Sequence, residues 1–179
     1  MNVFTSCECV DNILSCIYNY IVNTSLKKTC SFFGHRKITN AKTLSIELHE
    51  IIENLILDNY TDFYFGGFGE FDELCYNIVT ELKASYPNIN RIYCLTDIRH
   101  LRKSKRPKYL KDEYYEQYVY LEPSFDYWYT RIYYRNCEII NIIDLIIFFV
   151  ENRENSGAYK IYKYAKIKHK HYINLFRKK

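Results

Sequence analysis

The segments TCSFFGHR, residues 29–36, and DFYFGGFG, residues 62–69, decide the fold class of this chain. Each begins as a short run rich in aromatic residues, which is typical of a buried strand, and each ends in glycine, which permits a tight turn. A stretch with helical periodicity follows each of them, over residues 40–57 and residues 70–85. In the first stretch, one face carries Leu44, Leu48, Ile51, Ile52 and Leu55. A strand followed by a helix, twice in succession, predicts parallel βαβ units.

The same alternation continues to the end of the chain. We expect strands over residues 29–33, 62–65, 89–95, 142–150 and 171–175, and further helices over residues 124 or 126 to 141 and residues 157–168. Thr39 or Asn40 is expected to cap the first helix, and Pro87 prevents the second from continuing. Residues 97–112 are polar and basic, and residues 113–124 are rich in Tyr; neither segment shows a periodicity. The prediction is an α/β fold, a Rossmann-like three-layer sandwich whose mainly parallel sheet has about five strands flanked by helices.

Length and composition fit a single domain. A chain of 179 residues with 48% hydrophobic and 26% charged residues can bury an ordinary core, which excludes disorder and coiled-coil classes. Residues 29–179 are expected to form the Rossmann-like domain. Residues 1–28 look like an N-terminal extension, with a short amphipathic helix predicted over residues 11–22 that could pack on the domain, form a homodimer contact or be poorly ordered.

Charge and cysteine content limit the class of partner. The net charge of +4 is too small for a dedicated nucleic-acid binder, but it suits a small anionic ligand. The seven cysteines form no CxxC pair, so we expect buried free thiols in a reducing cytoplasm, with no metal and no cofactor. The longest apolar run, residues 142–150, is too short to span a membrane, and the N-terminus lacks a secretory pattern. A cytoplasmic protein without a membrane partner is therefore expected.

Candidate ligand-binding residues follow the predicted strands. Open parallel sheets bind ligands at the carboxyl ends of their strands, where this chain places glycines and cations. The first strand leads to Gly34, His35 and Arg36, and the second leads to Gly66, Gly67 and Gly69, whose N–H groups could hold phosphate. This second turn matches neither GxGxxG nor the P-loop pattern. The carboxylates that follow, Glu70, Asp72 and Glu73, could either favour the helix dipole or accept hydrogen bonds from ribose or a base.

Further candidates lie later in the chain. Arg131 and Arg135 are four residues apart on a predicted helix, so they share one face and could bind phosphate, or be unpaired surface arginines. Asn136 follows them, and Ser156 and Gly157 open the last helix, where backbone N–H groups could meet an anion. The loop from Arg99 to Lys111 carries seven Lys or Arg, and it could be a solvated loop, a cationic lid or a nucleic-acid contact.

The order of these motifs resembles the SLOG superfamily, and especially its small single-domain bacterial and phage members. The matching pieces are residues 33–36, residues 66–72, Arg135-Asn136 with Asp144, Ser156-Gly157, residues 164–166 and residues 172–175. The resemblance covers about residues 29–176. It implies a Rossmann-like fold and a pocket at the strand ends for a nucleotide or a nucleotide-derived ligand. Members that are enzymes, the lonely-guy phosphoribohydrolases, cleave the N-glycosidic bond of a nucleoside monophosphate; others bind nucleotide signals or DNA.

The catalytic motif of the phosphoribohydrolases is only partly matched. Their Pro-Gly-Gly-x-Gly-Thr-x-x-Glu motif resembles residues 66–73, with Glu73 at the glutamate position, but it should follow a later strand, where this chain has NSGAYK at residues 155–160. The leading hypothesis is therefore a nucleotide-binding sensor or sequestering protein. An N-glycosidase with Asp72 or Glu73 as its catalytic carboxylate is the alternative. Single-stranded nucleic-acid binding through the loop from Arg99 to Lys111 and nearby tyrosines is the third hypothesis.

Overall fold

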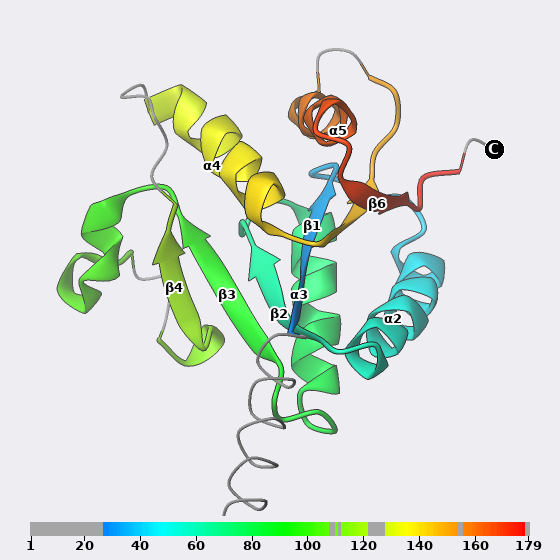
Figure 1. Ribbon diagram of the computed structural model, residues 1–179, viewed down its shortest axis with the longest axis horizontal. Helices are drawn as coiled ribbons and strands as arrows, with labels where there is room; N and C mark the ends of the chain where they lie inside the picture. The colour runs from blue at the N-terminus through cyan, green and yellow to red at the C-terminus, as the bar shows by residue number, and fades with distance from the viewer. Residues whose placement is uncertain (1–26, 108–109, 111, 122–127, 154–155, 178–179) are drawn as a thin grey trace, which may run out of the picture.

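The described residues of this computed structural model form one parallel sheet between two layers of helices (Figure 1). They are residues 27–107, 110, 112–121, 128–153 and 156–177. The sheet has six strands in the order β4-β3-β2-β1-β5-β6. Their bounds are β1 (Lys28–Gly34), β2 (Tyr60–Phe65), β3 (Asn90–Leu95), β4 (Gln117–Tyr120), β5 (Leu145–Phe149) and β6 (His171–Asn174). All neighbouring strands pair in parallel, so all carboxyl ends lie at the same edge.

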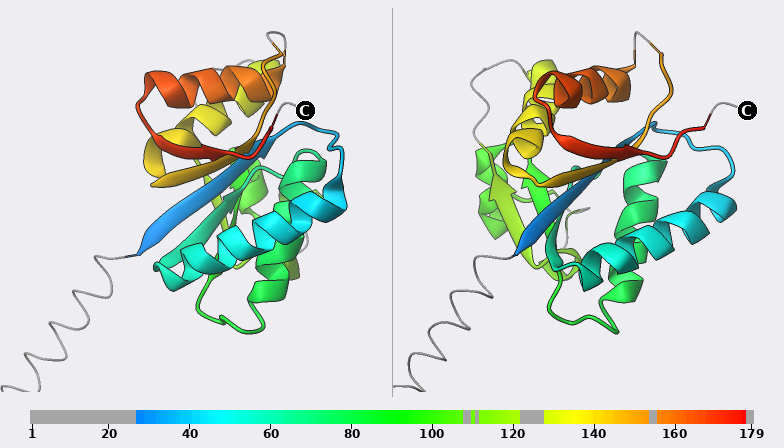
Figure 2. Two further views of the ribbon diagram at one scale, coloured as in Figure 1. Left: turned by 90° about the vertical axis from the view of Figure 1, so that its right-hand side faces the viewer. Right: turned by 45° about the vertical axis from the view of Figure 1, so that its right-hand side comes forward.

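Four helices cover the two faces of the sheet (Figures 1 and 2). The helices α2 (Ala41–Leu57) and α3 (Glu70–Leu82) lie on one face, and α4 (Trp128–Ile142) and α5 (Gly157–Ile167) on the other. Three short 3-10 helices, η1 (Ile98–Leu101), η2 (Lys103–Lys105) and η3 (Asp112–Tyr114), lie between β3 and β4. This confirms the predicted three-layer α/β class.

Alternation along the strands builds one core on each side of the sheet. On β1, Phe32 packs with Leu48 of α2 and Phe71 of α3, whereas the next residue, Phe33, packs in the core under α4 and α5. The strand β5 alternates in the same way and is buried on both faces from Ile146 onward. The four described cysteines, Cys30, Cys75, Cys94 and Cys137, are free and buried in these cores, and burial raises the pKa of Cys137 to about 11.

The sequence analysis expected about five strands, and the sixth is β4. It lies in the Tyr-rich segment for which no element was expected, and it pairs with β3 from Gln117 to Tyr120. It is a four-residue edge strand whose side chains are all at least partly exposed. A strand of this kind has no apolar alternation strong enough to mark it.

One boundary and one helix cap also differ from the expectation. The segment 142–150 was expected to be one strand, but α4 runs to Ile142 and β5 begins at Leu145. Asp144 lies between them, and its carboxylate accepts hydrogen bonds from the backbone N–H and the hydroxyl of Thr29, at 2.8 and 2.9 Å. Asn40 does precede α2, but it adopts a left-handed conformation and its side chain makes no capping hydrogen bond.

Little of the predicted N-terminal extension is described. The extension 1–28, with its helix over residues 11–22, lies outside the described residues except for its last two, and residues 27–28 lead into and begin β1. Among the helices of the described residues, none combines the length and the apolar character that crossing a membrane requires.

Candidate functional site

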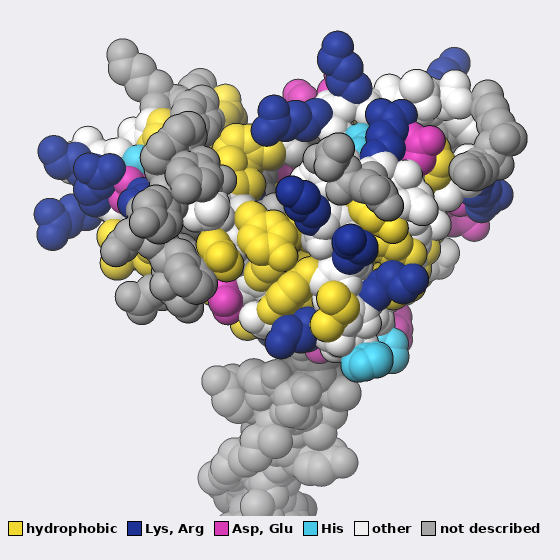
Figure 3. Space-filling view, turned by 90° about the horizontal axis from the view of Figure 1, so that it is seen from above, with side chains coloured by type: hydrophobic (Ala, Val, Ile, Leu, Met, Phe, Trp, Pro, Cys, Tyr) yellow, Lys and Arg dark blue, Asp and Glu magenta, His cyan; other side chains and the backbone are white. Residues whose placement is uncertain are grey.

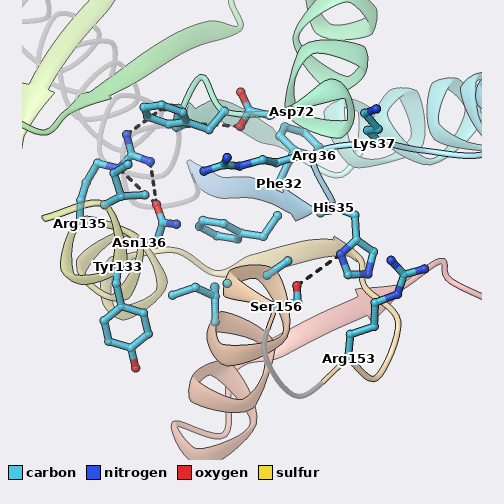
Figure 4. A pocket seen from close by; sticks show the side chains of 18 residues that line it. Phe32, His35, Arg36, Lys37, Asp72, Tyr133, Arg135, Asn136, Arg153 and Ser156 are labelled. Atoms are coloured by element: carbon cyan, nitrogen blue, oxygen red, sulfur yellow. Dashed lines mark hydrogen bonds between the residues drawn. The ribbon is translucent and has the colours of Figure 1, made fainter. Parts of the chain in front are cut away.

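A cavity of about 690 Å³ opens at the carboxyl ends of β1 and β5. The sheet grows from β1 in one direction through β2, β3 and β4, and from β5 in the other through β6. The cavity therefore lies at the topological switch point, the position where open α/β sheets bind ligands. Its lining comes from four places: residues 32–37, the turn and helix start with Gly66, Phe68 and Asp72, the α4 residues Ile132, Tyr133, Arg135 and Asn136, and Arg153 with Ser156, Gly157, Ala158 and Ile161 (Figure 4).

Cations outnumber carboxylates among the described residues that line this cavity. Arg36 and Lys37 follow β1, are exposed, and form no ion pair with a described residue. Figure 4 shows the Arg36 side chain lying across the cavity above Phe32. Arg153 lies beside His35 and pairs with Glu151 at 2.5 Å. Seen from above, the surface around the hollow carries several Lys and Arg side chains (Figure 3). The one carboxylate among the described lining residues is Asp72, so the cavity suits an anion.

Gly34 allows the turn after β1 to lie against α3. A Cβ at Gly34 would be 2.5 Å from the ring of Phe71, a distance that real contacts do not reach. The next residue, His35, donates its backbone N–H to the carbonyl of Phe149 on β5 at 3.2 Å. The end of β1 is thus fixed between α3 on one side and β5 on the other, which places His35 and Arg36 at the mouth of the cavity.

The His35 ring has one fixed tautomer when it is neutral. Its Nε2 accepts the backbone N–H of Glu151 at 2.8 Å, so this nitrogen carries no proton. The proton of the neutral ring is then on Nδ1, 3.4 Å from the hydroxyl oxygen of Ser156. Burial, together with the nearby charge of Arg153, lowers the pKa of His35, which favours this neutral form. Because Nδ1 is a donor here, His35 does not act as a base toward Ser156 in this arrangement.

Ser156 is the N-cap of α5. Its hydroxyl oxygen accepts the backbone N–H of Tyr159 at 3.4 Å. Gly157 and Ala158, the first residues of the helix, line the cavity with backbone N–H groups that have no acceptor inside the helix. As expected from the sequence, Ser156 and Gly157 lie at a helix start that faces the cavity.

The glycine turn after β2 is held by Asp72. One carboxylate oxygen of Asp72 accepts the N–H of Gly66 at 3.2 Å, and the other accepts the N–H of Gly67 at 2.8 Å. We had expected these N–H groups to hold phosphate, but both are already bonded within the chain. The reason is that Asp72 is in the first turn of α3, so its side chain points back at the preceding loop.

Glu70 and Gly69 fix this turn against the loop after β1. The carboxylate of Glu70 accepts the N–H of Ile38 at 2.9 Å, and the N–H of Glu70 donates to the carbonyl of Arg36 at 3.0 Å. Gly69 has a φ of 99°, and a Cβ there would lie 2.8 Å from the Cα of Arg36. These contacts set the position of Arg36, and they give Glu70 a local partner in place of the expected ribose contact.

Asp72 is a buried carboxylate on the cavity wall. Its exposed fraction is 6%. Burial raises its pKa to about 6, although the N–H groups of Gly66 and Gly67 and the charge of Arg135 act in the opposite direction. A carboxyl group with a pKa near neutrality can exist in either protonation state under ordinary conditions. Asp72 also borders a second hollow of about 220 Å³, and Glu73, the second catalytic candidate, lies only there, together with Gly67, Gly69 and several tyrosines.

Arg135 is a fully buried cation that joins α4 to two strand ends. Only 1% of it is exposed. Its Nη1 donates to the carbonyls of Gly66 at 2.9 Å and of Cys94 at 3.1 Å. Its Nε and Nη2 donate to the side-chain oxygen of Asn136 at 3.2 and 2.8 Å. These bonds use most of the N–H groups of the guanidinium. Arg135 therefore holds the carboxyl ends of β2 and β3 in place. The amide nitrogen of Asn136 makes no hydrogen bond with a described residue.

Arg131 does not join Arg135 in the cavity. It is one turn earlier on α4, it is not among the lining residues, and its Nη1 lies 3.9 Å from the carboxylate of Asp97. The structure therefore does not bring the two arginines together at the cavity, and Arg131 pairs with Asp97 where the sequence left open a phosphate contact or an unpaired surface position. The spacing places both on one side of the helix, but only Arg135 is far enough along it to reach under the glycine turn.

Among the lining residues that were not predicted, three could contact a ligand through a charge or an exposed ring: Lys37, Arg153 and Phe68. Lys37 and Arg153 are cations beside expected site residues, and adjacency to Arg36 and to Ser156 could have indicated them. Phe68 lies within the glycine turn and is 44% exposed. Its ring lies 5.4 Å from the guanidinium carbon of Arg135. Because 18% of the residues in this chain are aromatic, a single Phe between glycines does not stand out in the sequence.

Comparison with known proteins supports the fold. No family model matches the chain, and no curated protein matches it. Among solved structures, the chain is similar to the X-ray structure of TM1055, a structural-genomics target, with a TM-score of 0.53 and 15% sequence identity. The match covers 81% of this chain and 72% of that chain. At this identity the similarity shows a common Rossmann-like α/β fold.

Proposed function

We propose that the cavity binds a nucleotide or a nucleotide-derived anion, and that the protein acts as a sensor or a sequestering protein for it. The observation that carries this proposal is the side chain of Arg36. It lies across a cavity at the switch point of the sheet, without an ion-pair partner among the described residues. The volume of about 690 Å³ is within the usual range for small-molecule sites.

The phosphate is proposed to bind between Arg36 and the start of α5. The N–H groups of Gly157 and Ala158 would donate to its oxygens, because helix N-termini carry unpaired donors and a partial positive charge. Arg153 adds a second cation at this side of the cavity. These donors replace the N–H groups of Gly66 and Gly67, which Asp72 already uses.

The rest of the ligand is proposed to be a planar base. Phe68 exposes almost half of its side chain at the cavity while the guanidinium of Arg135 lies against its ring. Such a ring offers a surface on which a base can stack. The free amide nitrogen of Asn136 can donate to a ribose or base oxygen. These two residues favour a nucleotide over a bare phosphate ion.

The resemblance of the motif order to the SLOG superfamily supports the same class of ligand. The residues behind that resemblance include Gly34, His35, Arg36, Ser156 and Gly157, and all five lie on the lining of one cavity. The homodimer and the nucleic-acid contact through the loop from Arg99 to Lys111 stay predictions.

A thermal-shift screen tests the proposal. The ligands are mononucleotides, NAD, ADP-ribose derivatives and cyclic dinucleotides, with ribose 5-phosphate and inorganic phosphate as partial ligands. A ligand at about 100 times its Kd adds about 2.7 kcal/mol, which is a shift of roughly 5 to 11 °C for a domain of this size. A screen in which no compound raises Tm would reject the proposal.

The variant Phe68→Leu tests the role of the base. We expect it to weaken binding of adenosine 5′-monophosphate by about 1 kcal/mol, the range for aromatic pairs, and to leave ribose 5-phosphate binding unchanged. Phe68→Tyr keeps the ring and serves as the control. Equal weakening for both ligands would show that Phe68 supports the loop and does not contact a base.

A second candidate, an N-glycosidase, is favoured by one observation: the buried carboxyl of Asp72 on the cavity wall, with a pKa of about 6. Hydrolysis breaks the bond between the ribose C1′ and the ring nitrogen of the base, and a water molecule supplies the hydroxyl group that bonds to C1′ and the proton that the base takes up. A carboxylate can stabilise the positive charge that develops at C1′, or a carboxylic acid can protonate the leaving base. Release of free adenine from adenosine 5′-monophosphate by the wild type and by Glu73→Gln, but not by Asp72→Asn, would establish this activity. Turnover that survives in Asp72→Asn would exclude Asp72 from it.

A further inference from the structure

The charges of this chain are separated along the sequence. Residues 155–179 contain eight of the 25 Lys and Arg residues and none of the 21 Asp and Glu residues. This segment therefore carries a charge of +8, and residues 1–154 carry −4, which together give the net charge of +4. The modest overall value hides a strongly basic end that includes α5 and β6.

The structure places four of these cations on the exposed surface of the last helix, with Lys160, Lys163 and Lys166 three residues apart and Lys168 directly after the helix. The α5 lysine row consists of Lys160, Lys163, Lys166 and Lys168, which are all exposed and lie on α5 or directly after it. Three of the four ammonium groups are held over tyrosine rings. Lys163 lies 5.5 Å from the ring centre of Tyr159, Lys166 5.6 Å from that of Tyr162, and Lys168 5.6 Å from that of Tyr164.

No described carboxylate neutralises this row. The ion pair that the described part of the segment forms is that of Arg177 with Glu47 on α2, away from the row. The acids on the elements next to α5 have other partners: Glu138 accepts from Asn141, and Asp144 accepts from Thr29. Helix α5 thus presents positive charge to solvent without compensation from the described residues.

The row has an energetic cost in the isolated protein. Lys160, Lys163 and Lys166 are three residues apart, so their charges are neighbours on the helix and repel by a few tenths of a kcal/mol per pair. Lys160 also lies near the positive N-terminal end of the helix dipole. Solubility would be served as well by interspersed charges of both signs. A partner of opposite charge would offset this cost.

We propose that the α5 lysine row binds the phosphate backbone of nucleic acid without sequence preference. The row extends about 12 Å along the helix, at 1.5 Å per residue, which suits a partner with regularly repeated negative charges. Lysine binds phosphate as a point charge and reads no base, so the contact is to the backbone. A lipid surface fits less well, because the apolar side of α5, with Ile161 and Ala165, is buried in the core and leaves no face to insert. A second copy of the same face would be repelled by it.

This surface is distinct from the loop that the sequence had suggested for nucleic acid. In that loop, Arg99 is bonded to the carboxylate of Asp97, and the guanidinium of Arg106 lies 3.7 Å from the centre of the Tyr118 ring. Charges that are already engaged gain less from a phosphate. The loop therefore provides a matched control of similar charge.

The test is the binding of fluorescein-labelled DNA of about 20 nucleotides, single-stranded and duplex, without terminal phosphates, by fluorescence polarisation from 50 to 200 mM salt. We expect the triple variant Lys160→Gln, Lys163→Gln, Lys166→Gln to weaken binding about tenfold or more. The slope of log affinity against log salt should fall by about 2, since each lost contact contributes about 0.7 to 0.9. Because the three side chains are exposed and repel one another only weakly, the Tm of the variant should be no lower than that of the wild type.

Three results would overturn the proposal. One is that the wild type does not bind DNA at 50 mM salt. If it binds phosphatidylserine vesicles under the same conditions, the partner of the row is a lipid surface. Another is an equal or larger loss in the control variant Arg102→Gln, Lys103→Gln, Lys105→Gln, which would assign the contact to the loop. The last is displacement of the DNA by millimolar adenosine 5′-monophosphate, which would show that the DNA binds in the cavity and not on the α5 lysine row. The test does not depend on the proposed nucleotide function.

Discussion

The backbone N–H of Glu151 donates to Nε2 of His35 at 2.8 Å and joins the loops after β5 and β1 across the switch point of the sheet. An N–H donor at this position requires an unprotonated nitrogen. The bond therefore fixes the tautomer of His35 and gives Ser156 a hydrogen-bond donor as its neighbour, where a serine nucleophile would need a base. The pair Ser156–His35 lines the cavity without forming a nucleophile and its base, which is compatible with the binding function proposed above.

The first prediction is a pH dependence from His35. Its pKa in the folded protein is below the ordinary value of about 6.5, so the unfolded chain takes up the proton first as the pH falls. The contribution of His35 to the free energy of unfolding is complete above pH 6.5, and it is lost as the pH falls through the pKa of the folded protein. Ring ¹⁵N NMR should show the Nδ1–H tautomer at pH 7.5 and a midpoint below 6.5. A midpoint above 6.5, or a proton on Nε2, would contradict this arrangement.

The second prediction concerns Asp72 and has the opposite sign. Its folded pKa of about 6 lies above the ordinary aspartate value of 3.8, so its contribution to stability is complete below pH 3.8 and is lost as the pH rises through 6. Urea unfolding of the wild type and Asp72→Asn should show the difference in stability, wild type minus variant, falling by roughly 2 to 3 kcal/mol from pH 4 to pH 7. Other groups titrate equally in both proteins and cancel. A difference that is constant or that rises with pH would show that burial does not control this carboxyl.

The third prediction compares two glycines of the cavity. A Cβ at Gly66 would lie 2.6 Å from Nη2 of Arg135, whose hydrogen bonds prevent it from moving away, whereas a Cβ at Gly157 would meet nothing within 4 Å. We expect Gly66→Ala to destabilise the protein by about 1 to 3 kcal/mol. Gly157→Ala should be neutral or stabilise it by about 0.4 to 1 kcal/mol. Chemical denaturation measures both values, and equal effects would mean that Arg135 does not occupy this position.

The fourth prediction compares the two arginines of α4. Lysine at position 135 keeps the charge but cannot bond to Gly66, Cys94 and Asn136 together, so Arg135→Lys should cost about 2 kcal/mol or more. Arg131→Lys, one turn earlier on the same helix, changes only a partly exposed 3.9 Å contact with Asp97 and should cost less than about 0.5 kcal/mol. Similar losses for both variants would contradict the buried role of Arg135.

Much of the fold could be predicted from the sequence because its signals are local. Apolar runs that end in glycine gave β1 and β2, and the spacing of Leu44, Leu48 and Ile52 gave the buried face of α2. The edge strand β4 could not be found in this way, since its stability comes from pairing with β3 and from no pattern of its own. The boundary between α4 and β5 was missed because both are apolar where they meet, and the break is set by the hydrogen bonds of Asp144 to Thr29.

The candidate site was predicted better in its positions than in its contacts. Strand order brings Gly34, Gly66 and Ser156 to one edge, which follows from parallel topology alone. The partner of each polar group does not follow from topology. The carboxylate of Asp72 accepts the N–H groups of Gly66 and Gly67. The guanidinium of Arg135 donates to the carbonyls of Gly66 and Cys94. Such bonds depend on how α3 and α4 pack on the sheet, which no local spacing encodes.

The most direct test of the central claim is an amide NMR titration of ¹⁵N-labelled protein with adenosine 5′-monophosphate. If the nucleotide binds in the cavity, the largest shifts should be those of residues 34–37, 66–69 and 156–158, while the amides of β4 and of the loop between β3 and β4 stay unchanged. Arg36→Gln should weaken the binding by about 1.5 to 3 kcal/mol, the range for hydrogen bonds to charged groups. Shifts confined to other surfaces, or no shift of the cavity amides at 10 mM nucleotide, would contradict the claim.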